Sequence, residues 1–464
     1  MSSLTFYIIA LIVVLGPAVI LHEFGHFIVA KLLGIRVETF SAGFGPRLFG
    51  VRWGTTDYRL SLIPLGGYVK LGGDESNAAI EGDGASNIPA GERFDLRPRW
   101  QKFLVMVAGP VMNILTALAV VFGGALMNGV PVSPAPVVAR VFEGGPSEKA
   151  GLRPGDRIVE FNGVEEPSWQ RIKDDASLSP ERALPAVVER GGQRVGLTIT
   201  PVKIVDEGEA IGTLDFRPDY GALPVVVDDV LKDSPAAKAG LQDGDRILTI
   251  NGESVGDETD VRNVIRAHKA EALRIKIERN GQPSELVTGT ERLPGDKLGV
   301  TTAVELPQAR VGVVGAAAFA VRRNLDVLRM TGEAFAQIFR GERSARASFA
   351  GPIEIARQSS NAITRFGWAG LFSMLGFLSL NLGVVNLLPI PVLDGGAIFL
   401  LGVEKVLSLT GRRMSLRLRE RIQYVGFIFL FLLMGFVITN DAIKTVGRWR
   451  GANNNQPAAT EPGK

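Results

Sequence analysis

Residues Leu4–Ala30 read LTFYIIALIVVLGPAVILHEFGHFIVA. The run is almost wholly apolar, and it is longer than the roughly 20 helical residues that cross a bilayer. The exceptions are His22, Glu23 and His26, in its second half. Ionisable groups at that depth are energetically costly, so they are rarely placed there without a function. This stretch therefore predicts a transmembrane helix that carries a polar site.

The polar site has the pattern His22-Glu23-Phe24-Gly25-His26. Positions i and i+4 share one helix face, so two imidazoles can bind one ion, and the adjacent glutamate can reach a metal-bound water as general base. Imidazole and carboxylate ligands with one open position favour a catalytic Zn²⁺. The alternative is a polar contact between helices.

Three further stretches are apolar enough to cross a membrane: Phe103–Val130, about Trp368–Leu388 and about Tyr424–Thr439. The first stretch lacks a basic start and a small-residue cleavage site, so we expect it to be retained rather than removed as a signal peptide. The predicted fold class is a mostly α polytopic membrane protein with four transmembrane helices.

The composition limits what the metal site can contain. The 464 residues include 51 basic and 48 acidic side chains, three His and no Cys, with a formal net charge of +3. So small a net charge gives no reason to expect nucleic-acid binding. Without Cys, thiolate ligands, disulfides and a Cys nucleophile are excluded. The third histidine, His268, lies beside Arg266 and Lys269 and is expected at a surface.

A third metal ligand is therefore expected at Asp394, in the segment Asn386-Leu-Leu-Pro-Ile-Pro-Val-Leu-Asp-Gly-Gly396. Pro389 and Pro391 must interrupt the helix, which a membrane tolerates only where protein or a cavity covers the freed backbone. If the first and third spans enter the bilayer from one side, Asp394 and the two histidines reach similar depths. Taken alone, the Leu-Asp-Gly-Gly sequence could equally be a turn.

Basic residues near the span ends indicate the orientation. Three groups of them can face the cytoplasm together if the N-terminus and residues 131–367 lie outside: Lys31 and Arg36; Arg97, Arg99 and Lys102; and Lys405, Arg412, Arg413, Arg417, Arg419 and Arg421. Lys444, Arg448 and Arg450 oppose this assignment but are outnumbered.

The region between the second and third spans contains a repeat. Residues Pro146–Gly163 return as Pro235–Gly252 at a shift of 89 residues, and the same shift carries Glu189-Arg190 onto Glu278-Arg279. Two blocks that match at one shift predict two copies of one module. Each copy is expected to contain a helical turn, a strand, an Asn-Gly turn, a helix and another strand.

The two copies resemble PDZ domains of the bacterial, circularly permuted kind, which are α+β. In such domains the N–H groups of an apolar–Gly–apolar loop hold a peptide carboxylate. We expect these loops at Ile211-Gly212-Thr213 and Leu298-Gly299-Val300, although Thr213 departs from the pattern. The alternative is a pair of spacers that bind no peptide.

A membrane-associated β-hairpin is expected between the first two spans, with strands at Val37–Ser41 and Tyr58–Ile63 and an end at Pro64 and Gly66-Gly67. A helical substrate hides its carbonyls in i→i−4 bonds and must unwind before hydrolysis. A hairpin near the metal could accept the unwound segment as an added strand. A purely structural hairpin is the alternative.

Taken together, the two metal-site motifs resemble the site-2 protease family of intramembrane zinc metalloproteases (peptidase family M50). The order of the spans and PDZ copies is similar to its bacterial regulator-of-sigma-E protease branch. Three further pieces match: Gly43–Pro46, Ile63–Lys70 and Ala108–Asn113. Ala397 departs from the pattern, because relatives often carry His there, but that position is not a metal ligand in the family.

The resemblance implies one Zn²⁺ per chain, ligated by His22, His26 and Asp394, with Glu23 activating a zinc-bound water. It also implies substrate contacts at Asn386, Pro389, Gly66 and Gly67, and peptide C-termini as partners of the PDZ loops.

The predicted function is that of an intramembrane zinc endopeptidase in a bacterial inner membrane, with periplasmic PDZ copies and an active site near the cytoplasmic side. By resemblance, its partners in the bilayer are single-span membrane proteins, such as an anti-sigma factor or remnant signal peptides, and the PDZ pair acts as a size filter. A catalytically silent PDZ scaffold is the main alternative. A transporter would need more spans.

The predicted segments are 1–33 (first span), 34–72 (β region), 73–101 (cytoplasmic loop), 102–130 (second span), 131–221 and 222–308 (PDZ copies), 309–366 (amphipathic helices), 367–396 (third span with its motif), 397–421 (basic loop), 422–444 (fourth span) and 445–464 (disordered tail).

Overall fold

The computed structural model describes residues 3–73, 88–132, 135–206, 209–219, 223–231, 233–256, 258–268, 271–293, 297–341, 351–409, 411 and 415–454. Two compact units form. The first comprises Met1–Met127, Gly312–Arg329 and Ala345–Lys464, and the second comprises Asn128–Val311 and Met330–Ser344. Residues 74–87 of the predicted loop 73–101 and the end of the predicted tail lie outside the described residues.

Four long helices dominate the first unit: α1 (Ser3–Leu32), α3 (Arg99–Asn128), α10 (Pro352–Asn386) and α12 (Leu416–Asn454). Each contains a stretch long and apolar enough to cross a membrane: Ile9–Leu32, Arg99–Asn128, Phe366–Asn386 and Arg421–Ile443. The four predicted spans are therefore confirmed as helices. The fourth agrees with the predicted segment 422–444 to within one residue at each end, and helical residues flank it on both sides.

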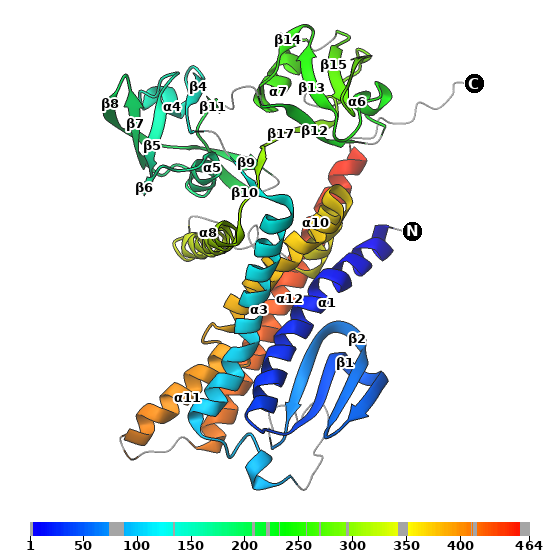
Figure 1. The fold of residues 1–464 in the computed structure, drawn as a ribbon, viewed down its shortest axis with the longest axis vertical. Coiled ribbons are helices and arrows are strands. Elements are labelled where there is room, and N and C mark those ends of the chain that lie inside the picture. The colour runs from blue at the N-terminus through cyan, green and yellow to red at the C-terminus, as the bar shows by residue number, and fades with distance from the viewer. Residues whose placement is uncertain are drawn as a thin grey trace, which may run out of the picture. The chain divides into compact units, whose positions relative to one another are not determined.

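The long helices of the first unit lie side by side (Figure 1), and glycines let their backbones approach closely. A Cβ atom at Gly25 of α1 would lie 2.3 Å from the carbonyl oxygen of Ala108 in α3, so only glycine fits there. At the other end of the unit, Asp441 of α12 accepts hydrogen bonds from the backbone N–H groups of Gly351, Ile353 and Glu354 at 3.0–3.2 Å. This carboxylate satisfies the free donors at the start of α10.

The predicted hairpin is a more elaborate sheet. Strands β1 (Val37–Trp53) and β2 (Thr56–Leu71) are both bent, so that residues 37–42 pair with 67–71 on one side and with 57–60 on the other. Residues 47–53 then pair with 56–61. The bend in β1 occurs at Gly43 and Gly45, whose φ angles of 94° and 88° suit glycine. The two strands thus form four adjacent antiparallel segments of one sheet, with 67–71 and 47–53 at its edges.

The predicted break at Pro389 and Pro391 is confirmed. Helix α10 ends at Asn386, and the next helix, α11 (Asp394–Leu409), begins eight residues later. The prediction of a basic loop over 397–421 is wrong for its first part, because Ala397–Leu409 is helical. Its apolar side chains and the acidic residue in its first turn favour a helix there.

Helices α8 (Val313–Phe339), α10 and α12 can be compared with the predicted amphipathic segment, third span and tail. Helix α8 covers the first part of the predicted amphipathic segment 309–366, and α10 is kinked at Gly367, at the start of its span. Helix α12 runs to Asn454, so the first ten residues of the tail predicted to be disordered are helical. The first proline of the tail, Pro457, comes only later, so nothing interrupts the backbone bonding up to that helix end. A short 3₁₀ helix, η2, spans Ala90–Glu92.

The second unit contains the two repeats. The first comprises β4 (Val138–Val141), α4 (Pro146–Lys149), β5 (Arg157–Phe161), β6 (Val164–Glu165), α5 (Trp169–Ser177), β7 (Leu184–Arg190), β8 (Gln193–Ile199), β9 (Val202–Asp206), β10 (Glu209–Thr213) and β11 (Phe216–Pro218). The second comprises β12 (Val225–Val230), α6 (Pro235–Lys238), β13 (Arg246–Ile250), β14 (Glu253–Ser254), α7 (Glu258–Ala267), β15 (Arg274–Arg279), β16 (Gln282–Val287) and β17 (Val300–Val304). Strands β3 (Val130–Pro131) and β18 (Gln308–Ala309) pair with each other.

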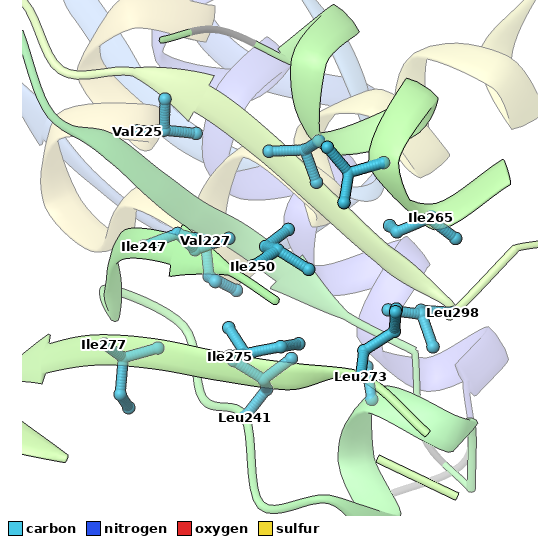
Figure 2. Packing of buried hydrophobic residues seen from close by; sticks show 13 residues of the cluster. Val225, Val227, Leu241, Ile247, Ile250, Ile265, Leu273, Ile275, Ile277 and Leu298 are labelled. Carbon is cyan, nitrogen blue, oxygen red and sulfur yellow. The ribbon is translucent and has the colours of Figure 1, made fainter. Parts of the chain in front are cut away.

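The repeats have the same core. Figure 2 shows that of the second repeat, where Ile247, Ile250 and Ile277 lie among buried aliphatic side chains. In the first repeat, Ile158, Phe161 and Val188 occupy the positions 89 residues earlier and are equally buried. The predicted duplication is therefore confirmed in three dimensions as two similar α+β modules.

A buried ion pair is duplicated as well. Arg190 donates from Nε and a terminal nitrogen to both oxygens of Asp156 at 2.7 Å, and Arg279 does the same to Asp245 at 2.6 and 2.7 Å. Both carboxylates are only 1% exposed. Burial alone would raise the pKa of Asp156, but the bonds from Arg190 and from the backbone of Arg153 outweigh it and hold that pKa below its usual value.

We predict that Asp156→Asn destabilises the first module by about 3 kcal/mol, because it leaves Arg190 without its charged partner. Hydrogen exchange on the intact protein should show β5 and β7 exchanging about a hundredfold faster. The matched change Asp245→Asn should affect β13 and β15 instead. Since the folded pKa of Asp156 is depressed, its contribution is present above about pH 4 and is lost as pH falls through the folded pKa. Equal exchange in both variants would contradict this assignment.

Candidate active site

Two imidazoles and one carboxylate converge in the first unit. His22 and His26 lie one turn apart on α1, with their Nε2 atoms 3.2 Å apart. One oxygen of Asp394, at the start of α11, lies 3.1 Å from Nε2 of His22 and 3.4 Å from Nε2 of His26. The three residues predicted as metal ligands, far apart in the sequence, therefore meet at one point.

These distances fit a zinc ion. Zn²⁺ bonds nitrogen and oxygen at about 2.0 Å, and two ligands of a regular tetrahedron with such bonds lie roughly 3.3 Å apart. The three ligand atoms form a triangle whose sides all lie close to that value. A tetrahedral ion placed over this triangle would keep its fourth position for water or substrate.

Both imidazoles are held by their other nitrogen. Nδ1 of His26 donates to the backbone carbonyl of Val105 at 2.7 Å, which leaves Nε2 as its metal-facing atom. Nδ1 of His22 lies 3.3 Å from Nδ2 of Asn113, whose Oδ1 accepts a hydrogen bond from Ser379 at 3.2 Å. With the Asn113 amide turned over, its oxygen would accept from Nδ1–H of His22 and leave Nε2 for the metal. Asn113 is fully buried in α3. Sequence reasoning gave it no role, although an asparagine within an apolar span is the signal that could have found it.

Helix α3 leaves room for the imidazole rings of His22 and His26 because residue 109 is a glycine. A Cβ atom there would lie 2.3 Å from Nε2 of His26 and 2.9 Å from Cε1 of His22. Any side chain at this position would therefore push into the imidazoles. The glycine in the Ala108–Asn113 segment is explained by this contact.

The turn between α10 and α11 places the carboxylate. Gly395 and Gly396 lie against the backbone of Leu387 and Ile390, where a Cβ would approach carbonyl oxygens to 2.3 and 2.1 Å. Val392 has a φ angle of 87°, which a β-branched residue rarely adopts. The backbone is thus tightly folded just before Asp394, and such strain is often found at functional sites.

A cavity of about 760 Å³ opens onto the convergence point. Glu23, Asn386, Gly66 and Gly67, four of the other predicted site residues, all line it. The amide nitrogen of Asn386 lies 3.3 Å from Nε2 of His22. Pro389 is exposed and is not among the residues that line the cavity, so a substrate contact there stays a prediction. The remaining lining includes residues 68, 69 and 71 of β2 and residues 423, 424 and 427 of α12.

One predicted peptide loop is placed wrongly by the sequence. In the second module, the carbonyl of Gly299 accepts from the N–H of Leu231, and β17 then pairs with β12. In the first module, the same role falls to Asp215, whose carbonyl accepts from Phe142, and not to Ile211 or Gly212.

An insertion explains the error. The chain advances 24 residues from Arg190 to Leu214 but only 19 from Arg279 to Leu298, so the repeat shift is no longer 89 there. The first module uses the additional residues near a hairpin of β9 and β10, which contains Ile211 and Gly212. Leu214-Asp215 is therefore the structural counterpart of Leu298-Gly299, and both Asp215 and Gly299 have positive φ angles.

Comparison with known proteins agrees with this geometry. The family model described as Peptidase family M50 matches residues 10–433. A Vibrio cholerae protein described provisionally as a zinc metalloprotease is 31% identical over 471 residues, which cover 95% of this chain and 99% of that protein. The regulator of sigma-E protease RseP of Escherichia coli K12 is 29% identical over 473 residues, and that of Salmonella typhimurium 14028s is 30% identical over 460, each with the same two coverages.

The match of the family model spans the helices that supply both histidines and the aspartate, together with both modules between them. The similar proteins align over nearly their whole lengths. The chain belongs to peptidase family M50 and is a zinc metalloprotease of the site-2 protease type.

Proposed function

We propose that this protein is an intramembrane endopeptidase that cleaves the membrane segments of single-span proteins, with one Zn²⁺ per chain held by His22, His26 and Asp394. The observation that carries the proposal is the tetrahedral spacing of these three ligand atoms. The two histidines are on a helix long and apolar enough to cross a bilayer, and Asp394 follows a second such span. When bound, the zinc supplies Lewis-acid chemistry for a water and a peptide carbonyl.

Glu23 follows a metal ligand on α1 and lines the same cavity, which suits it to take the proton of the attacking water and pass it to the leaving amine. The amide of Asn386, on the opposite wall, can donate a hydrogen bond to the substrate carbonyl as charge develops on its oxygen. The imidazoles are held in place by Val105 and Asn113, so the ligands need little rearrangement.

The outermost strand segment of the β1–β2 sheet is suited to hold the substrate. Residues 67–71 pair with 37–42 on one side, and residues 66, 67, 68, 69 and 71 line the cavity. A Cβ at Gly67 would lie 3.3 Å from Cγ of Glu23, so this strand lies directly beside the proposed general base. An unwound substrate segment that paired here would bring its carbonyl to the metal.

The similar proteins named as regulators of sigma-E suggest a bacterial inner membrane and an anti-sigma factor as substrate, with remnant signal peptides as a second class. The basic residues at the span ends support an active site near the cytoplasmic side and periplasmic modules. In this proposed orientation the two modules, as permuted PDZ domains, would exclude substrates with large external domains.

Of the two modules, we propose that only the second binds a peptide carboxylate, at Leu298-Gly299. Its strand β17 lies at the edge of a sheet, next to α7. In the first module, the carboxylate of Asp215 stands at the corresponding position and would repel a peptide C-terminus.

We predict that Glu23→Gln reduces cleavage of a co-expressed, tagged single-span substrate by 10²–10⁴-fold, because the general base is lost while the ligands remain. Zinc content, measured by elemental analysis, should stay at one per chain. Glu253→Gln, an exposed glutamate in the second module, serves as the control and should cleave normally. Cleavage at the wild-type rate by the Glu23 variant would refute the protease mechanism.

We also predict a graded loss of zinc. Asp394→Ala removes one of three ligands and should abolish both stoichiometric zinc and activity, whereas Asn113→Ala should weaken zinc binding by about 10–100-fold, because His22 loses its support. The two are distinguished by titrating zinc into the metal-free protein, since excess zinc should restore activity only to the Asn113 variant. Full zinc retention after Asp394→Ala would rule out this ligand set.

A further inference from the structure

A second hollow lies on the β1–β2 sheet, with a volume of about 830 Å³. Its lining is strongly polar and includes Thr39, Thr55 and Tyr68. It shares Tyr68 with the catalytic cavity but contains none of the metal ligands. The proposed protease chemistry therefore leaves this hollow without a function.

The hollow carries excess positive charge. Five basic side chains and two acidic ones line it: Arg36, Arg47, Arg52, Arg59 and Lys70, with Glu38 and Asp57. Both carboxylates already pair with cations, Asp57 with Arg47 at 3.2 Å and Glu38 with Lys70 at 3.5 Å. Glu92 approaches Arg36 to 3.8 Å, and counting it still leaves an excess of two positive charges. Such a site favours an anion.

The hollow lies at the end of a membrane span. The last turn of α1 contains Lys31, whose ammonium donates to Thr55 at the tip of the sheet at 3.4 Å. The candidate span of α1 ends at Leu32, so the tip and the hollow lie at the level where hydrocarbon gives way to headgroups.

The outer strand segment, residues 47–53, is amphipathic, as expected for a strand at the boundary between hydrocarbon and headgroups. Phe49, Val51 and Trp53 are 73%, 70% and 78% exposed, while Arg52 between them lines the hollow. Side chains of a strand alternate between faces, so the apolar set and Arg52 point to opposite sides. A tryptophan and aliphatic neighbours exposed beside a basic site are typical of a surface that lies in the membrane interface.

We propose that this hollow binds the phosphate of an anionic phospholipid, whose acyl chains lie along the exposed apolar side chains. Guanidinium groups match phosphate oxygens in geometry and charge, and basic residues near a membrane surface attract anionic lipids. An acidic segment of a substrate would use the same charges, but it would give no reason for the exposed apolar residues next to them.

The proposal is tested with the full-length protein in detergent, by native mass spectrometry during titration with phosphatidylglycerol or phosphatidylcholine. We expect wild-type protein to retain phosphatidylglycerol preferentially, and Arg52→Gln to bind it roughly five- to tenfold more weakly. Arg52→Lys should bind nearly normally. Arg99→Gln, a matched loss of one exposed charge at the start of α3, should leave binding unchanged. Zinc content checks that each variant is folded and is independent of the proposed proteolysis.

Several outcomes would overturn the proposal. Equal retention of the two lipids would mean that only apolar contacts act, and equal weakening by Arg52→Gln and Arg99→Gln would mean diffuse attraction. Displacement of the lipid by millimolar inorganic phosphate would indicate a site for small anions, and displacement by an acidic peptide would indicate a substrate-binding surface. If Arg52→Gln does not fold, a photoactivatable phosphatidylglycerol should crosslink to residues 36–70 of the wild-type protein; crosslinking elsewhere alone would refute the site.

Discussion

Two imidazoles and a carboxylate lie within hydrogen-bonding distance of one another, among helices suited to lipid. This contact constrains most of the surrounding structure. None of these groups could be left alone there without a large cost, so each must contact the others or a metal. That requirement brings the start of α11 against α1. It also requires the backbone of α3 to approach the rings, which Gly25 and Gly109 permit. Close contacts between helix backbones and side chains therefore lie where the chemistry is located.

The same constraint explains why a helix is broken inside the apolar region. A continuous helix from Asn386 to Asp394 would place the two side chains about two turns apart along one axis. The break instead brings both to one cavity, and its freed backbone groups are satisfied by local turns: Ile390 donates to Leu388 at 2.7 Å, and Leu393 donates to Ile390 at 3.1 Å. The prolines and the two glycines thus allow one segment to supply both the carboxylate of Asp394 and the amide of Asn386 to the same cavity.

The sequence predicted the parts of this protein that depend on local pattern. The spans follow from apolar length, the histidine pair from helical spacing, and the two modules from one constant shift. The sequence did not predict the features that depend on long-range packing or on an insertion in one repeat. The double pairing of β1 and β2 depends on bends at Gly43 and Gly45 that no strand pattern shows, and Asn113 acquires a role only from its contact with His22. The loop at Ile211 was misplaced because additional residues changed the shift between the copies.

The β1–β2 sheet links the two polar sites of the first unit, and its architecture gives a reason for their proximity. In the proposed mechanism a substrate strand leaves the lipid and reaches the metal, so the strand that accepts it would lie at membrane depth, where an exposed sheet would ordinarily be unstable. This sheet meets that demand with aromatic packing on α1, where Phe27 contacts Phe40 and Tyr58, and with a polar hollow on another face. Tyr68 belongs to both cavities, and the guanidinium of Arg59 lies 5.4 Å above its ring. An anion in the hollow would therefore act on the strand that lies beside Glu23, which makes the lipid surroundings a part of the active site's support.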